Sequence, residues 1–265
     1  ILIYNIHMTF DLEELLSFAN LLADESEKVI IQYFRKSFNV ENKEDESPVT
    51  IADKKTELKI RELIEKKYPT HGILGEEFEK KDTKSEYLWV IDPIDGTRSF
   101  IAGHKDFGTL IALLHNNKPI IGIINCPIHN ERWVGVINKK TKLNGKEVFT
   151  SKINVLEKSY VCTSGLYFNN DHFRKGFDKI LKKSRYHRFG GDCYMYGMLA
   201  SGLIEIVIED TLKAHDYMAL IPVIEGAGGK ITDKYGGLID LNSEGSVVVS
   251  ANLNLHKQLI DIINI

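Results

Sequence analysis

Apolar positions in the first part of the chain recur at helical spacing. From Asp11 to about Lys36 they would form one face of a helix, and "IADKKTELKIRELIEKKY" repeats the pattern until Pro69 interrupts it. Short apolar runs follow, each bounded by turn-forming residues: "GILGEE", "YLWVID", "GTLIALLHNNKPIIGIINCP" and "RWVGVI". The pattern predicts two opening amphipathic helices that cover one face of an antiparallel sheet.

The pattern changes near residue 150, where predicted strands and helices begin to alternate. The predicted strands are "SYVCTS", "YHRFG", "IEIVIED", "KITD" and "SVVVSA", and helices such as "DHFRKGFDKILKKS", "CYMYGMLASG" and "DYMALIPVIEGAGG" separate the first four. Alternation of this kind favours a second α/β unit with a mostly parallel sheet. We therefore expect a mixed α/β fold, with an α+β unit over residues 1–150 and an α/β unit over residues 151–265.

Composition narrows the classes of partner. The 265 residues are 43% hydrophobic and 27% charged, and a net charge of -3 with interspersed signs gives no basic face for nucleic acid. No apolar run approaches the roughly 20 residues that cross a bilayer. Cys126, Cys162 and Cys193 form no C-x-x-C pair, and the start lacks the features of a signal peptide. We expect a cytoplasmic protein without a nucleic-acid or membrane partner, in which residues 1–7 are a non-functional remnant upstream of Met8.

Two apolar runs end in adjacent or nearby carboxylates. "LWVIDPIDGTRSF" places Asp92 and Asp95 after one run, and "LGEEF" places Glu76 and Glu77 after another. Asp-Pro and Asp-Gly are also common turn dipeptides, so the first motif alone is insufficient. If the two strand ends are neighbours, however, their carboxylates would repel one another unless a divalent cation lay among them. Oxygen ligands of this kind favour Mg²⁺, and the sequence offers no Cys or His grouping typical of zinc.

Further residues extend this pattern. Gly96 and Thr97 follow the acids where a helix could start, and amide groups at a helix start are anion ligands. Asp53 and Asp216 each open a predicted helix. Either one alone is more often a helix N-cap than a functional residue.

Four segments in order resemble the inositol monophosphatase family of Mg²⁺-dependent, lithium-sensitive phosphatases: "SPVTIAD", "ILGEE", "WVIDPIDGTRSF" and "AHDYMALIPVIEGAGG". The resemblance spans about Ser47 to Asp233. It implies a layered α-β-α-β-α sugar-phosphatase-like fold, a homodimer, and two or three Mg²⁺ ions, with Mn²⁺ as an alternative. The ligands that it implies are Glu76, Asp92, the backbone carbonyl of Ile94, Asp95 and Asp216.

The resemblance also implies roles in hydrolysis of a small-molecule phosphate ester. Glu76 and Thr97 would orient a metal-bound water for in-line attack on phosphorus, and a second ion would stabilise the leaving alkoxide. Asp53 would belong to the shell of a further metal or position the nucleophile's network. Gly96 and Thr97 would bind the phosphate. Glu77 would be a supporting carboxylate, although the two adjacent glutamates are easily confused.

The segment "RFGGDCYMYG" is similar to the branch of the family that hydrolyses L-histidinol phosphate in histidine biosynthesis. Family members that accept inositol phosphate typically carry small residues where this chain has Asp192. Asp192 and Glu209 would pair with the ammonium and imidazole groups of histidinol phosphate, with Gly191 beside them. His215 stands where relatives often have an aromatic residue, and it would stack on the substrate or mark altered specificity.

Three alternatives stay open at this point. Asp192 could simply cap a helix, and the substrate could be inositol 1-phosphate or another sugar or polyol phosphate. A non-enzyme reading, a regulatory partner of the transcription machinery, would require a basic surface or a degraded set of metal ligands. The sequence shows neither feature.

Overall fold

The computed structural model describes residues 11–37, 40–42 and 48–265, so the predicted remnant at residues 1–7 lies outside the described residues. The helices are α1 (Leu12–Tyr33), α2 (Ile51–Lys67), α3 (Thr97–Ile101), α4 (Asp171–Lys183), α5 (Asp192–Ala200), α6 (Ala214–Tyr217), α7 (Leu220–Ala227), α8 (Leu253–Ile263) and the 3-10 helix η1 (Leu156–Lys158). The strands are β1 (Val40–Asn42), β2 (Pro48–Thr50), β3 (Gly72–Gly75), β4 (Tyr87–Asp95), β5 (Gly108–His115), β6 (Lys118–Cys126), β7 (Glu131–Val136), β8 (Lys142–Leu143), β9 (Lys146–Glu147), β10 (Tyr160–Thr163), β11 (Tyr186–Phe189), β12 (Ile206–Glu209), β13 (Lys230–Thr232) and β14 (Val247–Ser250).

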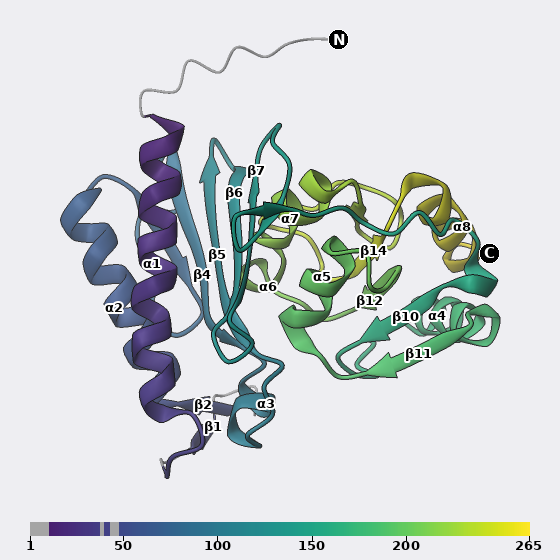
Figure 1. Cartoon of the computed structure of the whole chain (residues 1–265), viewed down its shortest axis with the longest axis horizontal. Coiled ribbons are helices and arrows are strands. Elements are labelled where there is room, and N and C mark those ends of the chain that lie inside the picture. Colours follow the sequence, from purple (N-terminus) through teal and green to yellow (C-terminus); the bar gives the residue numbers. More distant parts are fainter. Residues whose placement is uncertain (1–10, 38–39, 43–47) are drawn as a thin grey trace.

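The elements form five layers, which confirms the predicted α-β-α-β-α fold. Helices α1 and α2 cover one face of a seven-stranded sheet with the order β3-β4-β5-β6-β7-β8-β9 (Figure 1). Helices α5, α6 and α7 lie between this sheet and a five-stranded sheet with the order β11-β10-β12-β14-β13. Helices α4 and α8 form the outer layer. Within the described residues, no helix has both the length and the apolar content needed to span a membrane.

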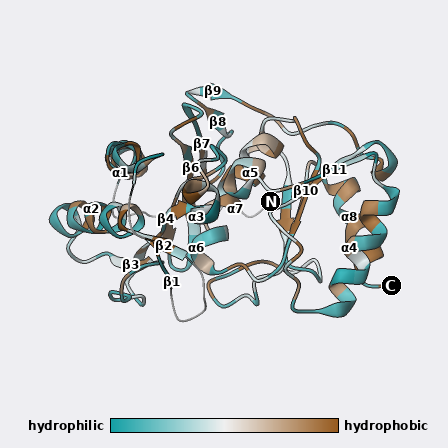
Figure 2. Ribbon diagram, turned by 90° about the horizontal axis from the view of Figure 1, so that it is seen from below, coloured by the Kyte–Doolittle hydropathy of each residue, from teal (hydrophilic) through white to brown (hydrophobic). Residues whose placement is uncertain are grey.

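Alternation along the strands places apolar side chains on both faces of each sheet (Figure 2). One core lies under the opening helices, one surrounds the middle helices between the two sheets, and one lies under the outer helices. On β4, Trp89 faces the opening helices, whereas Val90 faces the middle layer. On β12, Val207 faces the middle layer and Ile206 packs toward Phe177 of the outer layer. The middle core contains residues of both sheets, and the chain passes from one sheet to the other between β9 and β10. The predicted division of the chain into two units near residue 150 therefore stays a prediction, because both parts contribute residues to the same core.

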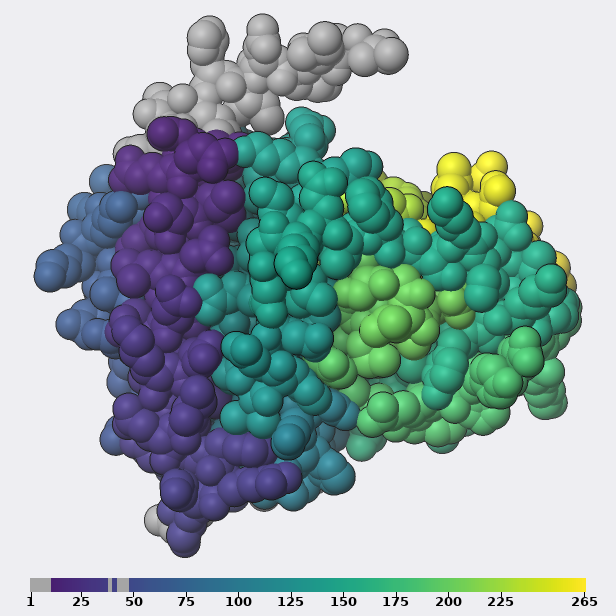
Figure 3. Space-filling model, viewed as in Figure 1, coloured from purple at the N-terminus to yellow at the C-terminus, as the bar shows by residue number. Residues whose placement is uncertain are grey.

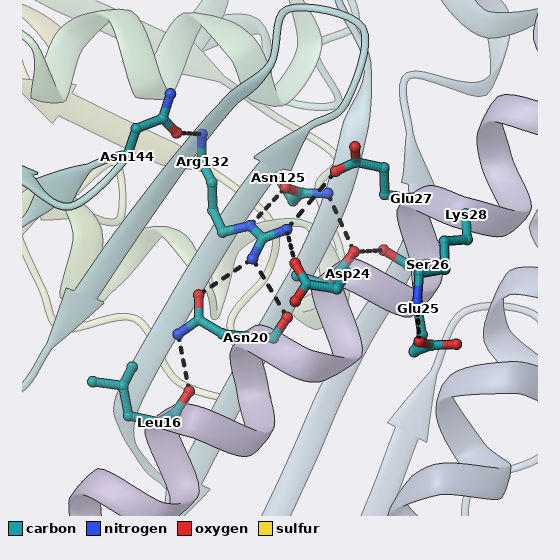
Figure 4. Close-up of polar contacts among 11 residues, drawn as sticks. Leu16, Asn20, Asp24, Glu25, Ser26, Glu27, Lys28, Asn125, Arg132 and Asn144 are labelled. Carbon is teal, nitrogen blue, oxygen red and sulfur yellow. Dashed lines mark hydrogen bonds and ion pairs between the residues drawn. The ribbon is translucent and has the colours of Figure 1, made fainter.

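Arg132 of β7 ties the seven-stranded sheet to α1 (Figure 4). Its guanidinium contacts Asp24 at 2.7 Å and donates to the Asn125 side chain at 2.8 Å. Asn20, one turn earlier on α1, accepts weaker hydrogen bonds at 3.4 Å. The space-filling view shows the opening helices in close contact with this sheet, and the second unit on its other side (Figure 3).

The prediction that the first sheet is antiparallel is wrong at its edge, where β3 and β4 run parallel. Gly75 at the end of β3 lies opposite Ile91 of β4. The segment 76–86 carries the chain back to the start of β4, as a parallel pair requires. Because parallel strands finish at the same edge of a sheet, the ends of β3 and β4 lie side by side. An antiparallel pair would have placed them at opposite edges.

The second sheet is less parallel than predicted. The β10 pairings with β11 and β12 are parallel, but β14 pairs antiparallel with both β12 and β13. The segment between β13 and β14 has no crossover helix, so an antiparallel return follows. The predicted helix "DYMALIPVIEGAGG" is also divided into α6 and α7. Pro222 has no amide hydrogen to donate to the carbonyl of Met218, which favours a break at this point.

Because two histidines are buried, we expect the free energy of unfolding to fall in acid. His71 stacks between Tyr68 and Tyr87, with ring centroids 4.5 and 4.9 Å away, and His256 lies in the outer core. Burial lowers the pKa of each from the usual 6.5 to about 4. The unfolded chain therefore binds these protons first, and the free energy of unfolding should fall as the pH decreases from about 6.5 to about 4, by about 1.4 kcal/mol per pKa unit for each group.

Urea unfolding across this pH range would measure the loss. His71→Asn should reduce the dependence of the unfolding free energy on pH, whatever it does to stability at neutral pH. His172→Asn, at an exposed position of α4, is the matched control and should leave the dependence unchanged. An unaltered pH dependence in His71→Asn would contradict the assignment.

Candidate metal and phosphate site

The predicted carboxylates gather where the parallel strands β3 and β4 end. Glu76 directly follows β3, and Asp92 and Asp95 lie near the end of β4. Asp216 enters from α6, and carboxylate oxygens of Asp92, Asp95 and Asp216 all lie within 4.8 Å of one another. The glutamate that approaches Asp92 is Glu76, which the family resemblance proposes as a ligand.

Asp53 and Asp216 each use one carboxylate oxygen to hold the start of a helix. Oδ2 of Asp53 accepts a hydrogen bond from the Thr50 amide at 2.8 Å, and Oδ2 of Asp216 accepts one from the Lys213 amide at 2.6 Å. Oδ1 of Asp53 accepts a hydrogen bond from the Thr97 hydroxyl at 3.2 Å. The helix-capping interpretation and the functional one are therefore compatible, because capping leaves a second oxygen of each carboxylate available.

The electrostatics of this cluster fit a divalent cation. Burial, followed by the charges of Glu76, Asp95 and Asp216, raises the pKa of Asp92 well above its usual range. Burial and the charge of Asp192 do the same for Asp95. Oδ1 of Asp92 is buried, and no donor within the described residues reaches it. A buried oxygen without a donor among mutually repelling carboxylates is what a hard cation with oxygen ligands would resolve.

The loop after Asp95 is shaped by a glycine. Gly96 has a φ of +85° and immediately precedes α3. A Cβ atom at this position would lie 2.8 Å from Oδ2 of Asp192, so a side chain would collide as well as strain the backbone. The Thr97 hydroxyl lies 3.1 Å from the carbonyl oxygen of Ile94. The first amides of α3 have no partner within the helix and are suited to an anion.

These groups can bind a divalent cation, orient a hydroxyl group and help to deprotonate a water molecule. A bound divalent cation would neutralise the carboxylates and lower the pKa of a water molecule bound to it. Burial raises the pKa of Asp53, so its carboxylate is a stronger base than a surface aspartate. Its hydrogen bond with Thr97 orients the hydroxyl at the edge of the cluster. Thr97 can therefore hold a proton, and Asp53 can accept it, beside Gly96.

Asp192 contacts helix α3 instead of capping α5. It is the first residue of this helix and has a φ of +42°, in the sparsely populated left-handed region. Its Oδ2 accepts a hydrogen bond from the Ser99 hydroxyl of α3 at 2.6 Å. The next residue, Cys193, donates its amide hydrogen to the carboxylate of Asp95. The start of α5 is thus held against both the carboxylate cluster and α3.

A cavity of about 280 Å³ opens beside Asp95, and its lining has more acidic than basic side chains, with Arg98 as the basic one. Asp192, Glu209 and Asp210 line it, and Gly190 lines it in place of the predicted Gly191. Glu209 accepts hydrogen bonds from the Ser164 amide at 3.1 Å and the Tyr196 hydroxyl at 2.5 Å. Burial raises the pKa of Glu209 to about 7. His215 instead lines a neighbouring cavity of about 600 Å³ together with Glu76.

Sequence reasoning missed several residues that position the site. Glu57 of α2 is fully buried and accepts hydrogen bonds from the amides of Glu77 and Phe78, at 2.7 and 3.3 Å. It thereby fixes the backbone just after Glu76. Arg61, four residues later, donates to Glu57 at 2.7 Å. An i, i+4 Glu-Arg pair on a helix usually indicates an exposed surface, so only the apolar positions around Glu57 could have indicated its burial.

Comparison with known proteins agrees with this geometry. A sequence model described as "Inositol monophosphatase family" matches residues 11–264. The bifunctional phosphatase IMPL2, chloroplastic, of Arabidopsis thaliana is 42% identical over 260 residues, which cover 95% of this chain and 75% of that protein. A histidinol-phosphatase of Chlorobaculum parvum is 35% identical over 241 residues, with 90% and 92% covered. The solved structure of an inositol monophosphatase from Zymomonas mobilis matches with a TM-score of 0.87 and 39% identity, over 96% of this chain and 98% of that chain.

The fold and the carboxylate cluster, together with these relatives, define a phosphoric monoester hydrolase that acts on small-molecule phosphate esters. The family model matches nearly the whole described chain. The chain belongs to the inositol monophosphatase family, whose members are Mg²⁺-dependent.

Proposed function

We propose that this enzyme hydrolyses L-histidinol phosphate in histidine biosynthesis. The acidic cavity beside Asp95 carries the proposal, because Asp192, Glu209 and Asp210 surround the space next to the metal and phosphate groups. Histidinol phosphate carries an ammonium and an imidazole, which these carboxylates can pair with. Inositol phosphate offers only hydroxyl groups beyond its phosphate, so Arg98 would be the one cationic group that faces these carboxylates within the described lining.

The proposal assigns separate roles to the two sides of the site. Glu76, Asp92, the carbonyl of Ile94, Asp95 and Asp216 hold the divalent cations, with Mg²⁺ at the oxygen-only position, while Gly96 and Thr97 bind the phosphate beside Asp53. Asp192 and Glu209 bind the cationic part of the substrate. A second ion, a homodimer and a cytoplasmic location stay predictions from the family resemblance and the composition.

Replacing Asp192 tests the choice of substrate. Asp192→Asn keeps the shape of the side chain and an acceptor for Ser99 but removes the charge. We expect kcat/KM for histidinol phosphate to fall by about 10- to 100-fold, as the loss of a charged hydrogen bond implies, while turnover of myo-inositol 1-phosphate changes little. The measurement is Mg²⁺-dependent phosphate release from both esters.

Asp106→Asn is the matched control. Asp106 lies near Asp192, but Arg188 and His129 pair with its carboxylate, and it does not line the cavity. The control should keep the preference for histidinol phosphate. A parent enzyme that prefers inositol phosphate, or an Asp192→Asn variant with unchanged selectivity, would refute the proposed substrate.

A further inference from the structure

His215 brings a nitrogen donor to the carboxylate cluster. A ring nitrogen of His215 and carboxylate oxygens of Glu76 and Asp92 lie within 4.8 Å of one another. Asp92 also belongs to the oxygen-only group with Asp95 and Asp216. The described residues therefore offer two neighbouring sets of three ligands that share Asp92.

The spacing is that of donors around one metal ion. With Mg²⁺–oxygen bonds near 2.1 Å, donors on opposite sides of an ion are about 4.2 Å apart. The upper limit of 4.8 Å on the separations in the His215 set exceeds this span by about 0.6 Å, which side-chain adjustment can close. Both sets therefore have the size of a cation site before any large movement.

The burial of Asp92 also indicates a ligand in this cluster. Asp92 is 2% exposed, and within the described residues its Oδ1 has no hydrogen-bond donor. A carboxylate that belongs to both sets can use its two oxygens for two different ions. A cation in either set would supply a buried oxygen of Asp92 with a partner.

The backbone and the neighbouring cavity hold His215 in a suitable place. The adjacent Asp216 accepts a hydrogen bond from the Lys213 amide, which fixes the short turn of α6. Nε2 of His215 lies 3.4 Å from Oδ1 of Asp216. His215 and Glu76 both line the cavity of about 600 Å³, which gives this side of the cluster room for water and for entry of an ion.

The two sets differ in chemistry. Carboxylate oxygens favour Mg²⁺, whereas an imidazole nitrogen favours transition metals such as Mn²⁺ and Zn²⁺. We propose that Glu76, Asp92 and His215 form a mixed nitrogen and oxygen site that selects a transition-metal ion, beside the oxygen-only site of Asp92, Asp95 and Asp216. This inference deepens the proposed function and rests on it for the use of divalent cations. The two metal positions would then differ in the ion that each prefers.

Mn²⁺ is the probe because it reports its own ligands. In the Mn²⁺-loaded protein without substrate, electron spin echo envelope modulation should detect a coupled ¹⁴N nucleus from the imidazole. His215→Phe should remove this signal and weaken the binding of one Mn²⁺ ion by on the order of 100-fold, the upper end of what loss of a group that only supports a ligand costs. His215→Gln restores an oxygen donor, so it should bind the ion without a ¹⁴N signal and with a lower Mn²⁺-to-Mg²⁺ affinity ratio.

His172→Phe, on the distant helix α4, should keep both the ¹⁴N signal and the affinity. A parent protein without ¹⁴N coupling, or a signal that persists in His215→Phe, would overturn the inference. The readout does not depend on the substrate. If the ¹⁴N signal appears but histidinol phosphate is not hydrolysed, the proposed function fails while the mixed site stands. If histidinol phosphate is hydrolysed but the ¹⁴N signal is absent, the mixed site fails while the proposed function stands.

Discussion

Asp92→Asn is expected to eliminate Mg²⁺-dependent phosphate release while making the metal-free protein more stable. Asp92 belongs to both sets of ligands, so its loss affects every cation position in the cluster. Metal-based charge stabilisation is worth several kcal/mol of the barrier, which corresponds to at least about a 1000-fold loss in kcat. Initial rates with saturating Mg²⁺ would measure it.

The gain in stability follows from the same burial. The charges of Glu76, Asp95 and Asp216 disfavour a charged Asp92, whose pKa is raised. Asparagine is uncharged at every pH, so it removes the cost of either ionising or protonating this carboxyl, and it can donate a hydrogen bond to a neighbouring carboxylate. The melting temperature of the metal-free protein should therefore rise, and the further rise on adding Mg²⁺ should largely disappear.

An exposed carboxylate provides the comparison for this variant. Asp261→Asn on α8 removes a charge of the same kind from the outer surface and should change neither the rate nor the response to Mg²⁺. If Asp92→Asn retains turnover, or still melts at a higher temperature when Mg²⁺ is added, Asp92 is not a ligand.

The positions of the carboxylates could be predicted from the sequence, but the reason they meet could not. Apolar runs that end in acids indicate strand ends, and Glu76 and Asp92 lie at such ends. Yet the predicted antiparallel sheet would have separated these ends. The parallel pairing of β3 with β4 is set by the route of segment 76–86, and local residue patterns carry little information on that route.

The surroundings of Asp192 show a second limit. The sequence placed it at a turn before a helix, where capping is the usual role. Its contact with Ser99 joins segments of the chain that are more than 90 positions apart. The same applies to Gly96, whose lack of a side chain is required by Asp192 as well as by the local backbone. Contacts of this range depend on how the layers pack, which a single sequence does not reveal.

Glu57→Ala is expected to cause the largest loss of stability among single carboxylate variants near the site. Arg61, 11% exposed, would remain without its buried partner, and the amides of Glu77 and Phe78 would lose their acceptor. Breaking a buried pair of this kind costs about 3–5 kcal/mol. The segment that carries Glu76 would also loosen, so kcat should fall even in molecules that stay folded. Urea unfolding and initial rates at low temperature would measure the two effects.

A second glutamate on α2 separates the effect of burial from the effect of charge. Glu65 of α2 pairs with Lys81 across a 3.1 Å contact, but both side chains are well exposed. Glu65→Ala should therefore change the unfolding free energy by no more than about 1 kcal/mol and leave kcat unaltered. Glu57→Gln, which keeps an amide oxygen as an acceptor but removes the charge, should fall between the two. Equal effects of Glu57→Ala and Glu65→Ala would show that Glu57 does not support the Glu76 segment.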